Sequence, residues 1–143
     1  MKHIAIGNDH AGCEMKRVLI DWLEEQGYEV KNFGTDSPEP ADYPDFMHPV
    51  SVSVEKGEFD FGILICGSGQ GASITANKHQ GIRATLCWMP EIAHLARAHN
   101  DANMLCLPGR FLEKETAIKI LMAFLNTPFD GGRHQRRIDK VPI

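Results

Sequence analysis

The sequence predicts a single-domain α/β fold, a Rossmann-like three-layer sandwich in which a five-stranded parallel sheet carries helices on both faces. Apolar strand segments alternate with amphipathic helical segments along the 143 residues. Such alternation is typical of a parallel sheet, because a helix that packs on the sheet makes each connection between strands. Residues 61–66, FGILIC, are apolar throughout, as expected of a strand that is buried on both faces.

The chain before this central strand is predicted to supply two strands and two helices. Five apolar side chains fall on one face of the first helix, and Gly27 ends it. A later loop contains three acidic residues and two prolines. The expected elements are a strand at 2–7, a helix at 11–26, a strand at 28–33, the loop at 34–43 and a helix at 45–56.

The chain after the central strand continues the alternation. The expected elements are a helix at 73–78, a strand at 82–87, a helix at 90–99, a strand at 103–107 and a helix at 114–126. The last helix has an apolar face made by Ile118, Leu121, Met122 and Leu125. No linker or repeat interrupts the chain, so we expect one domain over 1–143, with 127–143 as its arginine-rich C-terminal tail.

The composition argues against several classes of protein. With 43 % hydrophobic and 24 % charged residues the chain is an ordinary globular domain, and its net charge of −4 argues against nucleic-acid binding. No apolar run approaches the roughly 20 residues that cross a membrane, and the first apolar run is too short for a signal peptide. The four cysteines are scattered without a C-x-x-C pair. We therefore expect reduced thiols and a cytoplasmic protein.

Ligands of such sheets bind beyond the carboxyl ends of the strands, near the point where the strand order reverses. Four segments are predicted to lie at that edge, namely residues 7–10, 66–71, 87–89 and 108–110. We expect the functional residues to converge there.

The loop after the central strand is predicted to bind an anion. Gly67, Gly69 and Gly71 permit a sharp turn, and backbone N–H groups at the start of the next helix can point at a phosphate or an enediolate oxygen. A dinucleotide site would place its loop after the first strand, with an acidic residue about 20 positions on, and a P-loop would end in Gly-Lys-Ser/Thr. Neither pattern is present, and a tight turn without a ligand is the alternative.

Cys66 stands directly before this loop and is the candidate catalytic thiol. We expect a lowered pKa for it, because the dipole of the following helix stabilises a thiolate, which can act as nucleophile or proton acceptor. Cys87 also ends a strand but lacks oriented amides, and Cys106 is expected in the core. Cys13 is the second candidate for a reactive thiol.

Two segments offer groups for proton transfer. Asp9 and His10 follow the first strand, where the histidine can bind phosphate or move protons, and the aspartate can instead cap a helix. His99 closes a helix whose dipole favours a protonated imidazole, so it is a candidate general acid or a simple cap. None of the seven histidines shows a metal-ligand spacing, and no metal is expected.

The tail combines Arg133, Arg136 and Arg137 with His134. If the tail is helical, Arg133 and Arg137 share one face, and guanidinium groups bind phosphate bidentately. Arg110, after the fifth strand, can join them; the alternative is a solvated basic tail. Together with a base, an acid and an anion-binding loop, these are the parts that an aldose–ketose isomerase needs.

Seven motifs match one known family in colinear order, from about residue 3 to residue 137. They are GNDHAG (7–12), DYPD (42–45), ICGSGxG (65–71), ANK (76–78), GIRA (81–84), ARxHNDAN (96–103) and GGRHxxR (131–137). This combination resembles ribose-5-phosphate isomerase type B, within a wider family that includes allose- and galactose-6-phosphate isomerases.

The resemblance implies roles for individual residues. Cys66 matches the base that removes the substrate proton, and His99, with Asp9 nearby, matches the residue that assists opening of the furanose ring. Ser68 keeps the hydroxyl that a threonine supplies in some members and joins these catalytic candidates. The implied substrate contacts are His10, Arg133 and Arg137 for the phosphate, Arg110 for the phosphate across a dimer interface, Tyr43 and Asn100 for the sugar, and the amides of Gly67, Ser68, Gly69, Gln70 and Gly71 for an anion hole.

The resemblance also implies a homodimer or a dimer of dimers with sites shared between chains, and neither metal nor cofactor. Ala72 stands where one branch of the family has a catalytic glutamate, so the cysteine-dependent branch fits. Trp88 and Met89 stand where relatives often carry small or acidic residues. They would narrow the pocket or pack at the subunit contact.

The leading function is therefore interconversion of D-ribose 5-phosphate and D-ribulose 5-phosphate through an enediolate, in the pentose phosphate pathway. A six-carbon 6-phosphate sugar, allose or galactose 6-phosphate, is an alternative substrate. A non-catalytic sugar-phosphate-binding subunit is the alternative from another class. Cys66 and His99 count against that subunit, because a pure binder needs neither.

Overall fold

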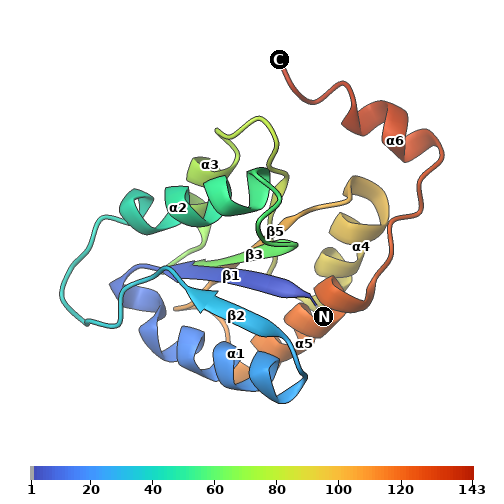
Figure 1. Cartoon of the computed structure of the whole chain (residues 1–143). Coiled ribbons are helices and arrows are strands. Elements are labelled where there is room, and N and C mark those ends of the chain that lie inside the picture. Colours follow the sequence, from blue (N-terminus) through green and yellow to red (C-terminus); the bar gives the residue numbers. More distant parts are fainter. Residues whose placement is uncertain (1) are drawn as a thin grey trace.

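The computed structural model describes residues 2–143 and confirms the predicted α/β fold (Figure 1). All neighbouring strands are parallel and lie in the order β2-β1-β3-β5-β4. Their bounds are β1 (His3–Asn8), β2 (Glu29–Asn32), β3 (Phe61–Cys66), β4 (Ala84–Leu86) and β5 (Met104–Pro108). The strand order reverses between β1 and β3, so the loops that follow these two strands flank the switch point.

Helices cover both faces of the sheet, as predicted. In Figure 1, α1 and α5 lie below the sheet, and α2 and α3 lie above it; α4 packs in the same layer as α1 and α5. The bounds are a 3-10 turn η1 (His10–Gly12), α1 (Cys13–Glu25), α2 (Pro44–Glu55), α3 (Gln70–Ala76), α4 (Pro90–Asn100), α5 (Lys114–Asn126) and α6 (Arg133–Ile138). Among residues 2–143, no helix has the length and apolar character that crossing a membrane requires.

β3 joins the two helix layers. Ile63 and Ile65 pack with α1, α4 and α5, whereas Leu64 and Cys66 pack with α2 and α3. All six residues of the strand are buried, as the apolar run predicts. Burying one large aliphatic side chain contributes about 1.5–3 kcal/mol, so this strand fixes the sheet firmly between its two layers.

Two elements near the glycine loop have different bounds from those predicted. α3 begins at Gln70 rather than at residue 73, because Gly69 adopts a left-handed φ of 75° and turns the chain directly into the helix. β4 retains three of the six expected residues. The side chain of Asn103 accepts the backbone N–H of Arg83 and so removes that group from the strand ladder.

The apolar face of α5 is rotated from the predicted one. Met122 is exposed, whereas Ala117, Ile120 and Phe124 are fully buried together with Leu121. These four positions follow the spacing of one helical stripe, shifted by about one residue. In the tail, α6 forms a short helix that projects from the body of the molecule (Figure 1).

Lys16 anchors the loop between β2 and α2 to α1. Its Nζ donates to the Thr35 carbonyl at 2.7 Å and to the Asp36 carboxylate, and its side chain is 4 % exposed. The hydrogen bond from the Lys16 ammonium lowers the pKa of Asp36. The same loop leads to Tyr43 at the start of α2, so this ion pair helps to place the tyrosine.

Asp36→Asn is expected to lower the free energy of unfolding at neutral pH by about 1 kcal/mol, because the buried Lys16 ammonium loses its counter-charge. The loss is no larger because solvent screens the exposed Asp36 carboxylate. Since the folded-state pKa of Asp36 is lowered, its contribution is complete above the ordinary carboxyl value of 3.8 and is lost as the pH falls through the lowered value. Urea unfolding of variant and parent near neutral pH and in acid measures the difference, which should shrink in acid.

Asp21→Asn, on the exposed face of α1, is the matched control and should leave stability unchanged at both pH values. An Asp36→Asn effect of the same size in acid as at neutral pH would contradict the ion pair.

Candidate active site

A cavity of about 340 Å³ lies at the carboxyl edge of the sheet, at the switch point. Cys66, the last residue of β3, forms part of its wall and is 5 % exposed. The other lining residues come from the loops after β1, β3 and β5, from α3 and from the start of α2. They are Asp9, Tyr43, Gly67, Ser68, Gly71, Arg110 and Phe111.

Backbone hydrogen bonds hold the loops after β3 and β5 against each other. The Gly109 N–H donates to the Cys66 carbonyl at 2.9 Å, and the Arg110 N–H donates to the Gly67 carbonyl at 3.0 Å. The Arg110 guanidinium therefore lies over Gly67, where an added Cβ would stand 3.3 Å from its Nη1. The resemblance implied that Arg110 reaches a site across a dimer interface, but here Arg110 lies in the same cavity as the Cys66 of its own chain.

The glycine loop makes the sharp turn that its composition predicts. At Gly69, which has a φ of 75°, an added Cβ would fall 2.4 Å from a leucine methyl of β4. At Gly71, an added Cβ would fall 2.6 Å from the ring of Tyr43. Ser68 Oγ accepts the Gln70 N–H at 3.3 Å. Glycine is therefore needed at both positions for the loop to approach β4 on one side and the tyrosine on the other.

Asp9 and His10 are both fixed by backbone groups. The Asp9 N–H donates to the Ile65 carbonyl at 3.2 Å, and its carboxylate Oδ1 accepts the Ala11 N–H at 3.0 Å. His10 Nδ1 accepts the Ala41 N–H at 3.1 Å. A neutral His10 therefore carries its proton on Nε2, from which it can donate to an anion.

The other three thiols lie outside the cavity. Burial raises the pKa of Cys106, with a further increase from Cys66 and Cys87, and burial also raises the pKa of Cys87. Cys13 is half-buried, and its thiol donates to the Thr35 carbonyl at 3.4 Å. Cys66 is thus the cavity thiol of the described chain.

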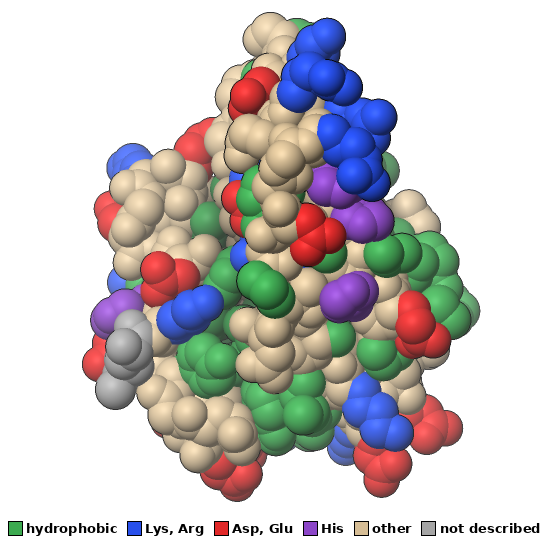
Figure 2. Space-filling model, turned by 90° about the vertical axis from the view of Figure 1, so that its right-hand side faces the viewer, with side chains coloured by type: hydrophobic (Ala, Val, Ile, Leu, Met, Phe, Trp, Pro, Cys, Tyr) green, Lys and Arg blue, Asp and Glu red, His purple; other side chains and the backbone are tan. Residues whose placement is uncertain are grey.

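The remaining predicted residues lie elsewhere, in what we call the His99 group: His99, Asn100, Arg133 and Arg137. The first two end α4 and the arginines belong to α6. Figure 2 shows Lys and Arg side chains gathered at the top of one face, over the tail, with histidine side chains beneath them.

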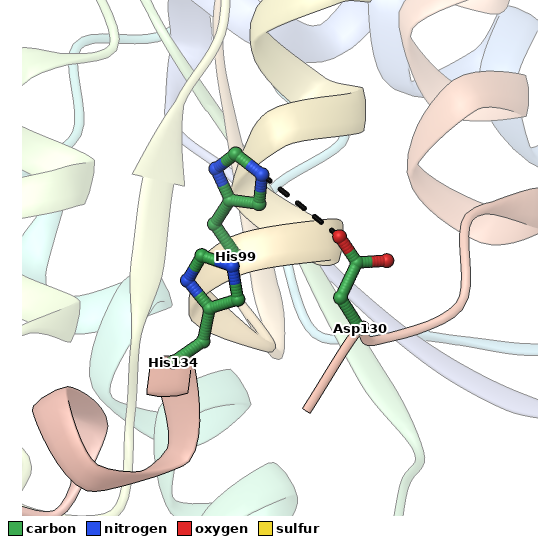
Figure 3. Close-up of side chains that lie close together, drawn as sticks. All are labelled: His99, Asp130 and His134. Atoms are coloured by element: carbon green, nitrogen blue, oxygen red, sulfur yellow. Dashed lines mark ion pairs between the residues drawn. The ribbon is translucent and has the colours of Figure 1, made fainter. Parts of the chain in front are cut away.

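Three side chains of this region lie close together (Figure 3). The rings of His99 and His134 are stacked, with centroids 4.4 Å apart and planes inclined by 9°. Asp130 Oδ2 lies 3.9 Å from His99 Nε2.

The prediction that all candidate residues converge on one edge is wrong for the His99 group within a single chain. Arg97, half a turn before His99, packs its guanidinium 4.9 Å from the ring centre of Phe61, the first residue of β3. Cys66 ends that strand, and a rise of about 3.3 Å per residue separates its two ends by roughly 16 Å. The physical reason is that α4 runs back antiparallel to the strand before it, so its last turn reaches the opposite edge.

The last turn of α4 is rigidly held. Asp101 adopts a left-handed φ of 45°, and its carboxylate accepts from Arg97 Nη1 at 2.8 Å. Arg83 donates to the carbonyls of Asn100 and Asp101, both at 2.9 Å. These bonds satisfy carbonyls that a helix end otherwise leaves without partners, and they fix the direction in which α4 presents its final residues.

The cluster of His99, Asp130 and His134 has the donor types of a metal site, with candidate ligand atoms within 4.8 Å of one another. The ring geometry does not suit a metal ion. The rings are parallel, so their lone pairs do not converge on one point. The pKa of His134 is lowered first by burial and then by His99 and Arg133; Asp130 opposes this by raising it, and Arg137 lowers it further.

Comparison with known proteins matches residues 4–141 to the ribose/galactose isomerase family. The chain belongs to this family. It is 46 % identical to ribose-5-phosphate isomerase B of Escherichia coli K12, over 99 % of this chain and 95 % of that protein. Two solved members of the family superpose closely on it.

The first is a ribose 5-phosphate isomerase of Thermotoga maritima, with a TM-score of 0.97 and 52 % identity over 99 % of this chain and 97 % of that one. The second is ribose-5-phosphate isomerase B of Mycoplasma genitalium with bound ribulose-5-phosphate. Its TM-score is 0.94 and its identity 42 %, over 97 % of this chain and 93 % of that one.

Two residues that lie beside the predicted site residues escaped sequence reasoning. Phe111 lines the cavity although its side chain is largely exposed, and a lone aromatic after a strand gives no signal of such a position. Asp130 directly precedes the GGRHxxR motif, and that adjacency is the signal that could have found it. Trp88 and Met89 are exposed and do not line the cavity in the chain alone, whereas Ala72 is fully buried.

Gly69→Ala is expected to reduce isomerase turnover and thermal stability more than Gly57→Ala does. Both glycines have a positive φ, of 75° and 78°, so an added Cβ costs each about 1–2 kcal/mol of backbone strain. At Gly57 nothing lies within 4 Å of the added atom, whereas at Gly69 it meets β4. Thermal unfolding and turnover of both variants measure the difference; equal losses would show that the loop has room to move.

Proposed function

We propose that this chain interconverts D-ribose 5-phosphate and D-ribulose 5-phosphate through an enediolate, as an enzyme of the pentose phosphate pathway. The observation that carries the proposal is the placement of Cys66, Asp9, Arg110 and the glycine loop around one cavity at the switch point. The names of its relatives support the substrate, since one is ribose-5-phosphate isomerase B and another was solved with ribulose-5-phosphate bound.

In the proposed reaction the Cys66 thiolate removes the proton from C2 of the open-chain aldose and returns it to C1, while a proton moves from the O2 hydroxyl to O1. Negative charge develops on the enediolate oxygens as C2 loses its proton. Backbone N–H groups of the loop 67–71 and the Ser68 hydroxyl are the donors that would stabilise this charge. Such fixed donors act most strongly where the cavity excludes water.

The cavity of one chain supplies few cations for a phosphate. Arg110 lies in it, and His10 can donate from Nε2 beside it. Arg133 and Arg137, which would bind phosphate bidentately, lie on α6 with the other tail residues. The phosphate of a substrate held at Cys66 therefore needs arginines from outside its own chain.

We propose that a homodimer completes the site. The separation of roughly 16 Å along β3 is longer than a five-carbon sugar phosphate, so His99 of the same chain does not reach a sugar at Cys66. A two-fold pair that sets the His99 group of one copy over the cavity of the other supplies the missing groups to both cavities at once. The projection of α6 from the body (Figure 1) supports such a contact. The exposed rings of Trp88 and Phe111 support it too.

We place the enzyme in the cytoplasm. All four cysteines are free thiols, and Cys66 must stay reduced to act as a base.

Purified protein is expected to convert ribose 5-phosphate in the presence of EDTA, and Cys66→Ala to lower kcat by about 10²–10⁴-fold, because it removes the proton acceptor. Cys13→Ala is the control and should keep the parent rate, since Cys13 lies outside the cavity. Ketose formation measures turnover, and thermal unfolding shows that both variants are folded.

Allose 6-phosphate is assayed in parallel. Faster turnover of this hexose would show that it is the preferred substrate and would leave the proposed proton-transfer chemistry unchanged. Full activity of Cys66→Ala would show that the base is another group. Activity that EDTA abolishes would contradict the metal-free mechanism, and a folded parent protein that turns over no sugar phosphate would contradict the enzyme.

A further inference from the structure

Phe111 puts an apolar ring on the wall of the cavity at Cys66, and the proposed reaction gives it no role. The other side chains of that wall, apart from the thiol, carry a carboxylate, a hydroxyl or a guanidinium group. Phe111 is 76 % exposed in the chain, whereas the next residue, Leu112, packs against the hydrophobic core. An aromatic ring with this exposure adds little to the core, so its place on the cavity wall calls for another explanation.

The backbone fixes Phe111 relative to the thiol. Cys66 pairs with Pro108 in the register of the sheet. The Phe111 N–H donates to the Pro108 carbonyl at 2.9 Å and so closes a four-residue turn directly after β5. The N–H groups of Gly109 and Arg110, inside this turn, bond to the loop after β3. The position from which the Phe111 ring projects is therefore set by hydrogen bonds rather than by packing of the ring.

A sugar phosphate in this cavity would meet two kinds of wall. Asp9, Ser68 and the loop amides can form hydrogen bonds with hydroxyl groups, and Arg110 can bind the phosphate. The ring of Phe111 has no hydrogen-bonding group and packs only against the C–H groups of a sugar. A hydroxyl that is turned toward this ring loses its hydrogen bonds to water and gains none from the protein, which weakens binding.

We propose that Phe111 is a specificity-determining residue that favours five-carbon over six-carbon sugar phosphates. The inference rests on the proposed function, because it takes the reacting carbons to lie at Cys66 and the phosphate at Arg110. A hexose 6-phosphate has one more carbon, with one more hydroxyl group, between those two ends. Since hydrogen bonds hold the two loops together, the longer sugar must bend outward between its ends, and Phe111 forms the wall next to Arg110.

Trp88 distinguishes an effect of the cavity wall from an effect of the subunit contact. It is also an exposed aromatic residue, 55 % exposed, and it follows β4 at the same edge of the sheet. Unlike Phe111, it does not line the cavity of the chain. A change that acts through the proposed contact between copies should appear at both positions, whereas a change in the cavity wall should appear only at Phe111.

The test compares Phe111→Ala, which removes the ring, with Phe111→Leu, which keeps most of the apolar bulk, and with Trp88→Ala as the matched control. The first readout is the ratio of kcat/KM for ribose 5-phosphate to that for allose 6-phosphate. A general loss of folded protein lowers both values equally and leaves this ratio unchanged. The second readout is the ratio of the Kd values of ribitol 5-phosphate and allitol 6-phosphate, measured by calorimetry. These open-chain alcohols have no carbonyl group and cannot isomerise, so their binding does not depend on turnover.

We expect the parent protein to favour the five-carbon compound in both readouts. Phe111→Ala should reduce this preference about tenfold, the lower end of the discrimination that one additional methylene produces in a fitted pocket. Phe111→Leu should restore most of the preference, because its side chain still leaves no room or hydrogen-bond partner for the additional hydroxyl. Trp88→Ala should keep the ratios of the parent protein.

A parent protein that favours the six-carbon compounds, or ratios that Phe111→Ala leaves unchanged, would overturn the proposal. An equal fall in Trp88→Ala, or a preference that Phe111→Leu does not restore, would overturn it as well. Failure of the isomerase function has a different signature, since a folded parent protein would then turn over neither sugar phosphate. If that protein still binds ribitol 5-phosphate more tightly and Phe111→Ala removes the difference, the selectivity of Phe111 stands without the reaction. Binding of neither alcohol would overturn both.

Discussion

Parallel pairing of β3 with β1 and β5 determines where every functional candidate lies. It sends the carboxyl ends of all three strands to one edge, so that Asp9, Cys66 and Arg110 surround one cavity. The parallel pairing of β4 with β5 likewise obliges α4, which connects these two strands, to return to the opposite edge, where it presents His99. Two backbone hydrogen bonds between the loops after β3 and β5 then fix the walls of the cavity relative to each other. Parallel pairing thus both builds the cavity at Cys66 and places His99 at the opposite edge of the sheet.

The separation of Cys66 from the His99 group bears on how charge is distributed over the chain. The chain carries a net charge of −4, yet its tail gathers three arginines on one short helix. Few cations line the cavity in which we propose that an anionic sugar phosphate reacts. The proposed second copy would account for both facts, because it would bring further arginines to a cavity that already has Arg110, and an anion to arginines that otherwise repel one another. Two solved members of the ribose/galactose isomerase family have this fold over nearly the whole chain, and the proposed contribution of arginines to a partner's cavity is a physical reason for it to pair.

Sequence reasoning succeeded where the signal is local. The apolar run of β3, followed by glycines at alternate positions, predicts a buried strand, a sharp turn and a thiol at its end, and the structure has all three. Sequence reasoning failed where side chains that are distant in the sequence determine the local structure. β4 is short because Asn103, about 20 residues away, takes a backbone N–H of the edge. The place of His99 depends on the direction of α4, which no motif encodes.

The most direct test of the shared site mixes two inactive variants, Cys66→Ala and His99→Asn, under conditions that exchange subunits. In the mixed dimer one site receives both substitutions and the other receives neither. Random exchange should therefore restore about a quarter of the parent activity. Parent protein mixed with the double variant is the control, since its mixed dimer has no intact site. If Cys66 and His99 instead act within one chain, the two single variants will stay inactive when mixed, and the account of a site shared between copies is wrong.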